Sequence, residues 1–306
     1  MPAFTAEHDA LRDTVRRVVE ARLGAMAAEA ETGATPHAAA LAELDAVGVV
    51  GLDDPRAALV VAEELGRLPS AGLAMALIDA AAVPGADGAP IGVARGQRVA
   101  VTGETASGSL PFVTAGAVAQ RCVIAAQGVV TDLAGAVVEV PDEPHGLRGA
   151  APAMVTLQQA GCRPVALQGW GLVELLQAAA AVSGGWRTWE QTRDYALQRE
   201  AFGRPVAHFQ VNRHALAAAA TRLTAAQALV RDTVRSWRPG ADPAIACRYA
   251  TATAVEVADV ALQLHGGYGY TTEFDVSRAW RDAHAWAVLA GGPPTPGAHG
   301  TQGVTA

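Results

Sequence analysis

The sequence contains no lysine: all 23 of its basic residues are arginine. A chain without lysine cannot form a Schiff base with a substrate, and it cannot build the phosphate loop whose lysine contacts a nucleotide. Aromatic residues are also scarce, at 5% of the chain, so a core must be built from alanine, valine and leucine. With 306 residues, 51% of them hydrophobic, the chain is long enough for one large core or several smaller ones.

Cysteine, long apolar runs and basic blocks are rare or missing as well. The three cysteines form no Cys-x-x-Cys pair and the histidines are scattered, so we expect a reducing compartment and no metal site. The most apolar stretch is interrupted by Asp79 and Pro84, and the first residues carry no continuous hydrophobic segment, which argues against a membrane anchor or a signal peptide. The net charge of −7 argues against nucleic acid. We predict a cytoplasmic protein that binds neither membrane nor nucleic acid.

The pattern of residues changes along the chain. The first part has apolar residues at helical spacing, with helix starts marked by Thr5 and by Asp54-Pro55. Short segments rich in valine, isoleucine and threonine follow, and long helical runs then return. This pattern predicts a mainly α fold with a small β domain. We expect an N-terminal helical domain (1–90), a reduced β domain (91–168), a C-terminal four-helix bundle (169–291) and a disordered tail (292–306).

Two sharp breaks interrupt the helices of the expected bundle. The first is REAFGRPVAHFQ, Arg199 to Gln210, and the second begins with QLHGGYGY at Gln263. The planar fork of an arginine suits phosphate oxygens, and paired glycines let a backbone approach a dinucleotide without a Cβ clash. Each break alone is also explained by a helix-to-helix turn or a glycine C-cap. Both breaks occur in this one chain, in this order.

The two breaks carry a resemblance to the acyl-CoA dehydrogenase family over residues 170–290. They follow its C-terminal signatures, Arg-x-x-Phe-Gly-x-Pro-x-x-x-x-Gln and Gln-x-x-Gly-Gly-x-Gly-Tyr with a later Arg-Asp, here Arg281-Asp282. The resemblance implies a helical N-terminal unit, a reduced β-barrel and a four-helix bundle, and it assigns Arg281-Asp282 to the structure of the bundle. It also implies that FAD is bound, often across a subunit boundary, by Arg199 at the pyrophosphate and by Phe202, Gln210, Gln263, Gly266 and Gly267.

The catalytic base departs from the family pattern. The implied reaction is α,β-desaturation of an acyl-CoA thioester, in which a carboxylate removes the α-proton while flavin accepts the β-hydride. The commonest position of that carboxylate, eight residues beyond the Asp of Arg-Asp, holds Ala290. The other family position, on the first bundle helix, holds Val173, and Glu174 is one residue away. One helical step rotates a side chain by about 100°, so Glu174 is either the base of a shifted helix or a solvent-facing or capping glutamate.

The β unit departs too. The family's Thr-Glu-Pro-x-x-Gly-Ser-Asp stretch has only a loose counterpart in TGETASGSL, Thr102 to Leu110, and its Gly-x-Lys-x-x-Ile-Thr stretch cannot be matched without lysine. We therefore expect the smaller subunit of an oligomer, in which an acyl-CoA dehydrogenase-like partner supplies flavin-ring contacts and the base. A homo-oligomer stays open, with electron-transfer flavoprotein as candidate electron acceptor. The alternatives are a non-catalytic assembly subunit without flavin, and a repurposed biosynthetic oxidase or hydroxylase acting on a carrier-bound acyl substrate.

Overall fold

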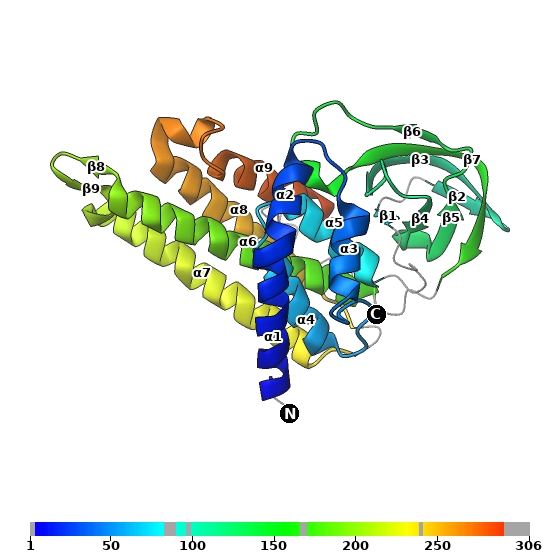
Figure 1. The fold of residues 1–306 in the computed structure, drawn as a ribbon, viewed down its shortest axis with the longest axis horizontal. Coiled ribbons are helices and arrows are strands. Elements are labelled where there is room, and N and C mark those ends of the chain that lie inside the picture. Colours follow the sequence, from blue (N-terminus) through cyan, green and yellow to red (C-terminus); the bar gives the residue numbers. More distant parts are fainter. Residues whose placement is uncertain (1–3, 83–89, 96–98, 166–169, 239–240, 291–306) are drawn as a thin grey trace, which may run out of the picture.

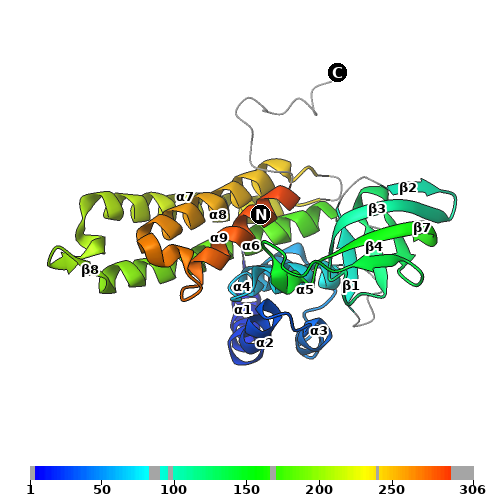
Figure 2. The ribbon, with the colours of Figure 1, turned by 90° about the horizontal axis from the view of Figure 1, so that it is seen from above.

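The computed structural model describes residues 4–82, 90–95, 99–165, 170–238 and 241–290. It shows a long helical bundle with a β unit at one end and shorter helices packed across its side (Figure 1, Figure 2). The predicted mainly α fold with a small β domain is confirmed. Within the described ranges no helix is both long and apolar enough to cross a bilayer. The tail that we predicted to be disordered, 292–306, lies outside the described residues.

The N-terminal helices start where the sequence predicts caps. At the first start the Thr5 hydroxyl lies 2.8 Å from His8 Nδ1, and the Thr5 amide donates to the same nitrogen. At another, the Asp54 carboxylate accepts from the Arg56 amide, with Pro55 at the first helical position. These helices are α1 (Ala6–Val18), a π-helical turn (Val19–Leu23), α2 (Gly24–Glu31), α3 (His37–Asp45), α4 (Pro55–Leu65) and α5 (Ala71–Ala82).

The β unit is a sheet that closes on itself. The strands are β1 (Ile91–Ala94), β2 (Val99–Thr102), β3 (Thr105–Thr114), β4 (Arg121–Ile124), β5 (Val129–Asp132), β6 (Val137–Glu139) and β7 (Ala153–Pro164). Their order is β2-β3-β1-β4-β5-β7-β6, and an extra pairing of β3 with β7 completes a barrel. The sequence did not predict β1 or β3. Strand β3 contains Gly108 and Pro111, and shifts of its register against β7 accommodate both residues.

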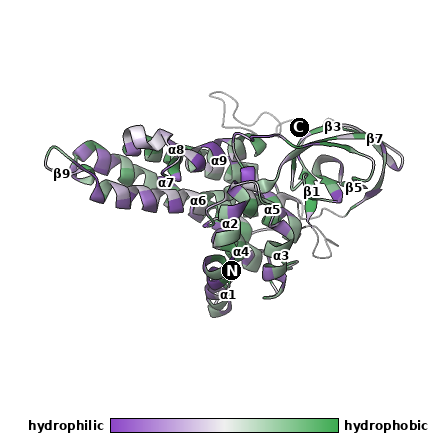
Figure 3. Ribbon diagram, turned by 45° about the horizontal axis from the view of Figure 1, so that its top comes forward, coloured by the Kyte–Doolittle hydropathy of each residue, from purple (hydrophilic) through white to green (hydrophobic). Residues whose placement is uncertain are grey.

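The bundle is formed by four helices, as the sequence predicted. They are α6 (Trp170–Gln198), α7 (Gln210–Arg235), α8 (Ala244–His265) and α9 (Val276–Leu289), with a small hairpin, β8 (Glu200–Ala201) and β9 (Arg204–Pro205), between α6 and α7. Figure 3 shows polar residues at intervals along the outer helices α1 and α7, whereas the buried helix α5 is almost entirely hydrophobic. The helices approach closely: a Cβ on Gly66 would lie 2.3 Å from the Ala180 carbonyl oxygen.

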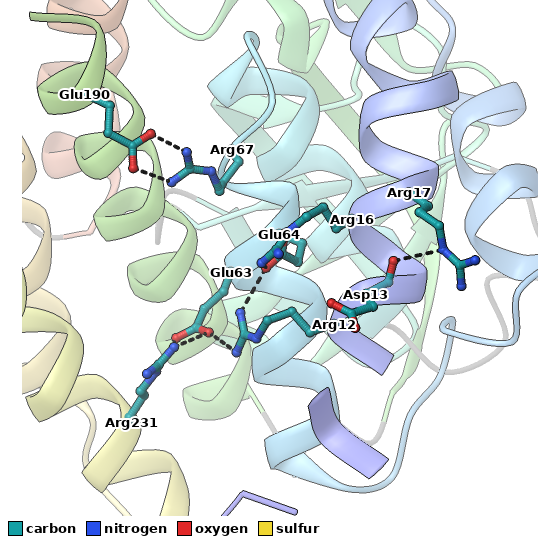
Figure 4. A network of polar contacts seen from close by, with 9 residues as sticks. All are labelled: Arg12, Asp13, Arg16, Arg17, Glu63, Glu64, Arg67, Glu190 and Arg231. Carbon is teal, nitrogen blue, oxygen red and sulfur yellow. Dashed lines mark hydrogen bonds and ion pairs between the residues drawn. The ribbon is translucent and has the colours of Figure 1, made fainter. Parts of the chain in front are cut away.

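Two adjacent buried carboxylates of α4 pair with arginines of α1, and one of them also pairs with the bundle (Figure 4). Glu63 on α4 accepts two hydrogen bonds from Arg231 of α7, at 2.7 and 2.8 Å, and one from Arg12 of α1 at 2.6 Å. Its neighbour Glu64 accepts from Arg12 and Arg16 of α1. Because an unpaired buried carboxylate is costly, these arginines fix α1 and α7 against α4.

Candidate functional site

The two predicted corners meet at the end of the bundle farthest from the β unit (Figure 1). One corner follows α6, and the other is η5 (Gly266–Tyr270), a 3-10 turn that follows α8. Four of the predicted residues, Arg199, Gln263, Gly266 and Gly267, line one crevice of about 490 Å³. The remaining lining residues are Tyr195, Val206, Leu264, His265, Tyr268 and Thr271. The two signatures therefore share one cavity.

The crevice offers the chemistry that a diphosphate needs. The Arg199 guanidinium lies over the Tyr268 ring, 5.7 Å from its centre, and makes no salt bridge with any residue that the structure describes. A Cβ built on Gly267 meets nothing within 4 Å, so a ligand can approach this backbone. An arginine whose charge is not neutralised, beside open glycine backbone, suits phosphate oxygens.

Aromatic rings form one side of the crevice. Tyr195 stacks on His265 with ring centres 4.2 Å apart, and Phe274 packs edge-on against both. Burial lowers the pKa of His265, although its hydrogen bond to the Ala261 carbonyl opposes this effect. Sequence reasoning missed this surface. One signal was available: Tyr195 precedes Arg199 by one helical turn, and Tyr268 fills the variable position of Gly-Gly-x-Gly.

Two predicted cofactor residues lie outside the crevice. Phe202 is 96% exposed at the tip of the β8–β9 hairpin, with a left-handed φ of 54°. Gln210 is exposed at the start of α7. Between them Arg204 lies 4.3 Å over the Phe209 ring. Phe202 and Gln210 thus face outward from the corner, and a cofactor role for them stays a prediction.

A second cleft, the interdomain cleft, separates the β unit from α9. Its polar part, of about 370 Å³, is lined by Arg148, Arg278 and Arg281, among others. Its more apolar part, of about 490 Å³, is lined by residues that include Pro111, Phe112, Met154 and Ala285. Residues 144–146 line both parts. The polar part is also lined by four carboxylates, Glu31, Glu143, Asp275 and Asp282, so it carries charges of both signs, whereas the other part is mainly apolar.

The sequence contained a signal for this cleft. Gly108 to Thr114 follows the family's Gly-x-Lys-x-x-Ile-Thr spacing, with buried Leu110 in place of lysine and Val113 in place of isoleucine. Pro111 and Phe112 in that stretch line the cleft. The loose counterpart of the other flavin-contacting segment, Thr102 to Leu110, lies in the β2–β3 hairpin, and its role stays a prediction.

A buried polar cluster ties Thr114 to the helices. The Thr114 hydroxyl donates to Asp79 of α5 at 2.7 Å, and Asp79 also pairs with Arg95 at 2.6 Å and accepts from Gln177 of α6. Burial raises the pKa of Asp79, and the charge of Arg95 opposes the rise. The cluster joins α5, the β unit and α6, and it occupies the Thr114 hydroxyl.

Neither family position for the base carries a carboxylate in this chain. Val173 is buried, whereas Glu174 beside it is exposed, as expected from their different directions on α6. Desolvation of the Glu174 carboxyl group raises its pKa, against a hydrogen bond from Trp170 and the charge of Arg95. Ala290 is the C-cap residue of α9. Neither position can therefore supply a base. A base has to be Glu174 after a change in its position, or a carboxylate that lies elsewhere.

Comparison with known proteins agrees with these features. Residues 166–293 match the family model of the acyl-CoA dehydrogenase C-terminal domain. The mitochondrial long-chain specific acyl-CoA dehydrogenase of Sus scrofa is 36% identical over 121 residues, which are 38% of this chain but only 28% of that enzyme.

Solved structures share the fold over nearly the whole chain. Glutaryl-CoA dehydrogenase from Mycobacterium smegmatis superposes with a TM-score of 0.79 at 19% identity, covering 95% of this chain and 92% of that one. An acyl-CoA dehydrogenase complexed with FAD from Bacillus anthracis superposes with a TM-score of 0.77 at 18% identity, over 94% of this chain and 66% of that one. The match of residues 166–293 places the C-terminal part of the chain in the acyl-CoA dehydrogenase family, and the chain as a whole shares the fold of these enzymes.

Proposed function

We propose that this chain is an FAD-binding subunit of an assembly that desaturates an acyl-CoA or carrier-bound acyl thioester. Its crevice holds the diphosphate end of an FAD molecule whose flavin ring lies on another subunit. The supporting observation is the length of α6, 29 residues, which at about 1.5 Å each spans roughly 43 Å. The crevice follows one end of α6 and the β unit precedes the other (Figure 1). A single FAD is too short to reach both in one chain.

Four residues of the crevice have definite tasks in this proposal. Arg199 neutralises the diphosphate, and Gly266 and Gly267 let the backbone approach it. Gln263 offers an amide that can donate and accept hydrogen bonds. When bound, FAD supplies the acceptor for the hydride that leaves the β-carbon. The residues of this chain bind and orient the cofactor.

The base comes from the other subunit. Desaturation needs a carboxylate to take the α-proton, and Ala290 and Val173 cannot do so. Glu174 is exposed beside the buried Val173, one helical step from the family position. We therefore expect that Glu174→Gln leaves turnover of the assembly within about twofold of wild type, and loss of turnover would assign the base to Glu174.

Flavin content tests the proposal. The chain is purified alone and after co-expression with an acyl-CoA dehydrogenase-like partner chain, and flavin stoichiometry and acyl-CoA-dependent dye reduction are measured. Arg199→Ala should lower the affinity of the assembly for FAD by about tenfold or more, since a charge-assisted contact is lost. Arg222→Ala on α7, which removes an exposed pair with Glu256 of α8, is the matched control. Equal flavin content in both variants would contradict the proposal.

Ala290 supports a second candidate function, a non-catalytic assembly subunit. In that case neither preparation contains flavin and the bundle serves association alone. Substrate-dependent oxygen uptake in place of dye reduction would instead indicate an oxidase or hydroxylase of the same fold.

A further inference from the structure

The segment 143–151, which connects β6 to β7, forms a wall of the interdomain cleft. Pro144, His145 and Gly146 line both its polar and its apolar part, and Arg148 lines the polar part. The shape of the cleft therefore depends on where this segment lies.

The segment has a strained backbone. Leu147 and Ala151 both adopt left-handed φ values, 55° and 44°, which are unfavourable for residues that carry a Cβ. Leu147 is also fully buried. Such a conformation persists only where contacts with the rest of the fold hold it.

The amides of Ala115 and Ala117 hold the far end of the segment through the Ala150 and Ala151 carbonyls, and helix α9 holds its near end at two successive residues. The Leu147 amide donates a hydrogen bond to the Asp282 carboxylate at 2.6 Å. A Cβ on Gly146 would lie 2.6 Å from the Arg281 carbonyl oxygen, so only glycine fits there. Asp282 is 3% exposed and lies 135 residues from its partner. The Arg-Asp pair that the resemblance assigned to the bundle thus also holds a segment of the β unit.

Few charges compensate the Asp282 carboxylate. The pKa of Asp282 is raised to about 7, chiefly by burial and also by the charge of Glu31 of α2, and the Leu147 amide, Arg278 and Arg281 only partly oppose this rise. On the segment itself, Glu143, His145 and Arg148 are the ionisable groups that line the cleft with α9. No direct salt bridge to Asp282 occurs among the described residues. The amide of Leu147 is thus the principal hydrogen-bond partner of this buried group.

We propose that Asp282 is a positioning residue: by accepting from the Leu147 amide it holds the segment 143–151 in its strained conformation and so fixes the width of the interdomain cleft. The cleft then admits a ligand with a polar, hydrogen-bonding end and an apolar body, which FAD and an acyl-CoA thioester both have. The choice between these ligands rests on the proposed function; the role of Asp282 in holding the segment does not.

Hydrogen exchange of the full chain without ligand tests the contact. Asp282→Ala should speed exchange of the Leu147 amide by roughly tenfold or more, because the bond that protects it is removed. Asp282→Asn, whose amide oxygen still accepts, should stay near wild type, and Asp232→Ala at an exposed pair on α7 is the control. Gly146→Ala should give the same increase by pushing the segment from α9. Unchanged exchange in both Asp282→Ala and Gly146→Ala would overturn the proposal.

Ligand affinity tests the consequence for the cleft. The assembly is titrated with FAD after flavin removal, and separately with octanoyl-CoA. Asp282→Ala should lower the affinity for the ligand that occupies the cleft by about fivefold or more, and Asp282→Asn should restore that affinity. If Asp282→Ala speeds hydrogen exchange but leaves both affinities unchanged, Asp282 does not position the cleft for a ligand. Wild-type protein that binds neither ligand would reject the proposed function, while the exchange result would still decide whether Asp282 holds the segment.

Discussion

At the scale of single residues, the glycines of η5 have different reasons to be glycine. Gly266 has a φ of 58° and a ψ of −136°, a conformation that residues with a Cβ avoid. A Cβ on Gly269 would lie 2.6 Å from the Leu262 carbonyl oxygen, whereas one on Gly267 would meet only open space. Gly269 is thus required by packing, and Gly267 is left free for a ligand.

A pair of alanine substitutions separates these roles. Gly269→Ala should destabilise the fold by about 1–3 kcal/mol, because the new methyl group collides with backbone. Gly267→Ala should leave the free energy of unfolding within about 0.5 kcal/mol of wild type and yet weaken FAD binding by the assembly. Urea denaturation and flavin titration measure the two effects. Unchanged FAD affinity in Gly267→Ala would show that the ligand does not approach this backbone.

The buried Asp282 carboxyl predicts a pH dependence. Its folded-state pKa of about 7 is well above the unfolded value of about 3.9, so the folded state holds this proton more tightly. Its contribution to stability is therefore full below about pH 4 and is lost as pH rises through about 7. The amide introduced by Asp282→Asn carries no such proton. This variant should become more stable relative to wild type between pH 5 and pH 8, by at least about 1.4 kcal/mol, in urea titrations at both values.

At the scale of elements, α4 is the link between α1 and α7 (Figure 4). Desolvation would raise the pKa of Glu63, but the hydrogen bonds and charges of Arg231 and Arg12 outweigh it, so the pKa is lowered. The contribution of Glu63 to stability is then present above its unfolded pKa of about 4.3 and lost as pH falls through the folded value.

Substituting Glu63 tests this link. Glu63→Gln should cost about 1–3 kcal/mol of unfolding free energy at pH 7, because both arginines lose a charged acceptor. Glu256→Gln, at an exposed pair with Arg222, should cost less than about 1 kcal/mol. The difference between Glu63→Gln and wild type should narrow below about pH 4 in chemical denaturation. A cost equal to that of the control would mean that the arginines do not fix α1 and α7.

The elements differ in how far sequence predicts them. Helix starts at Thr5 and Asp54 were predicted because a cap is a local interaction. Strand β3 was not, because Gly108 and Pro111 disfavour a strand locally while its pairing with β2, β1 and β7 outweighs this preference. Barrel closure is a long-range contact that no local pattern encodes.

At the scale of the whole molecule, the candidate site also has parts that the sequence predicts and parts that it does not. Arg199, Gln263, Gly266 and Gly267 were located by signatures, and the fold brings them to one crevice. The interdomain cleft could not be predicted as a cavity, because its walls come from β3, the segment 143–151 and α9. The contact of Asp282 with Leu147 joins residues 135 positions apart and has no counterpart in local spacing.

The length of α6 also bears on how such a chain can evolve. Its two ends carry separate tasks, since the crevice follows one end and the β unit precedes the other (Figure 2). After a gene duplication, substitutions at one end leave the packing at the other undisturbed. Natural selection can then preserve the arginine corner in a copy whose opposite end has drifted, and Ala290 is the kind of replacement that such drift leaves behind.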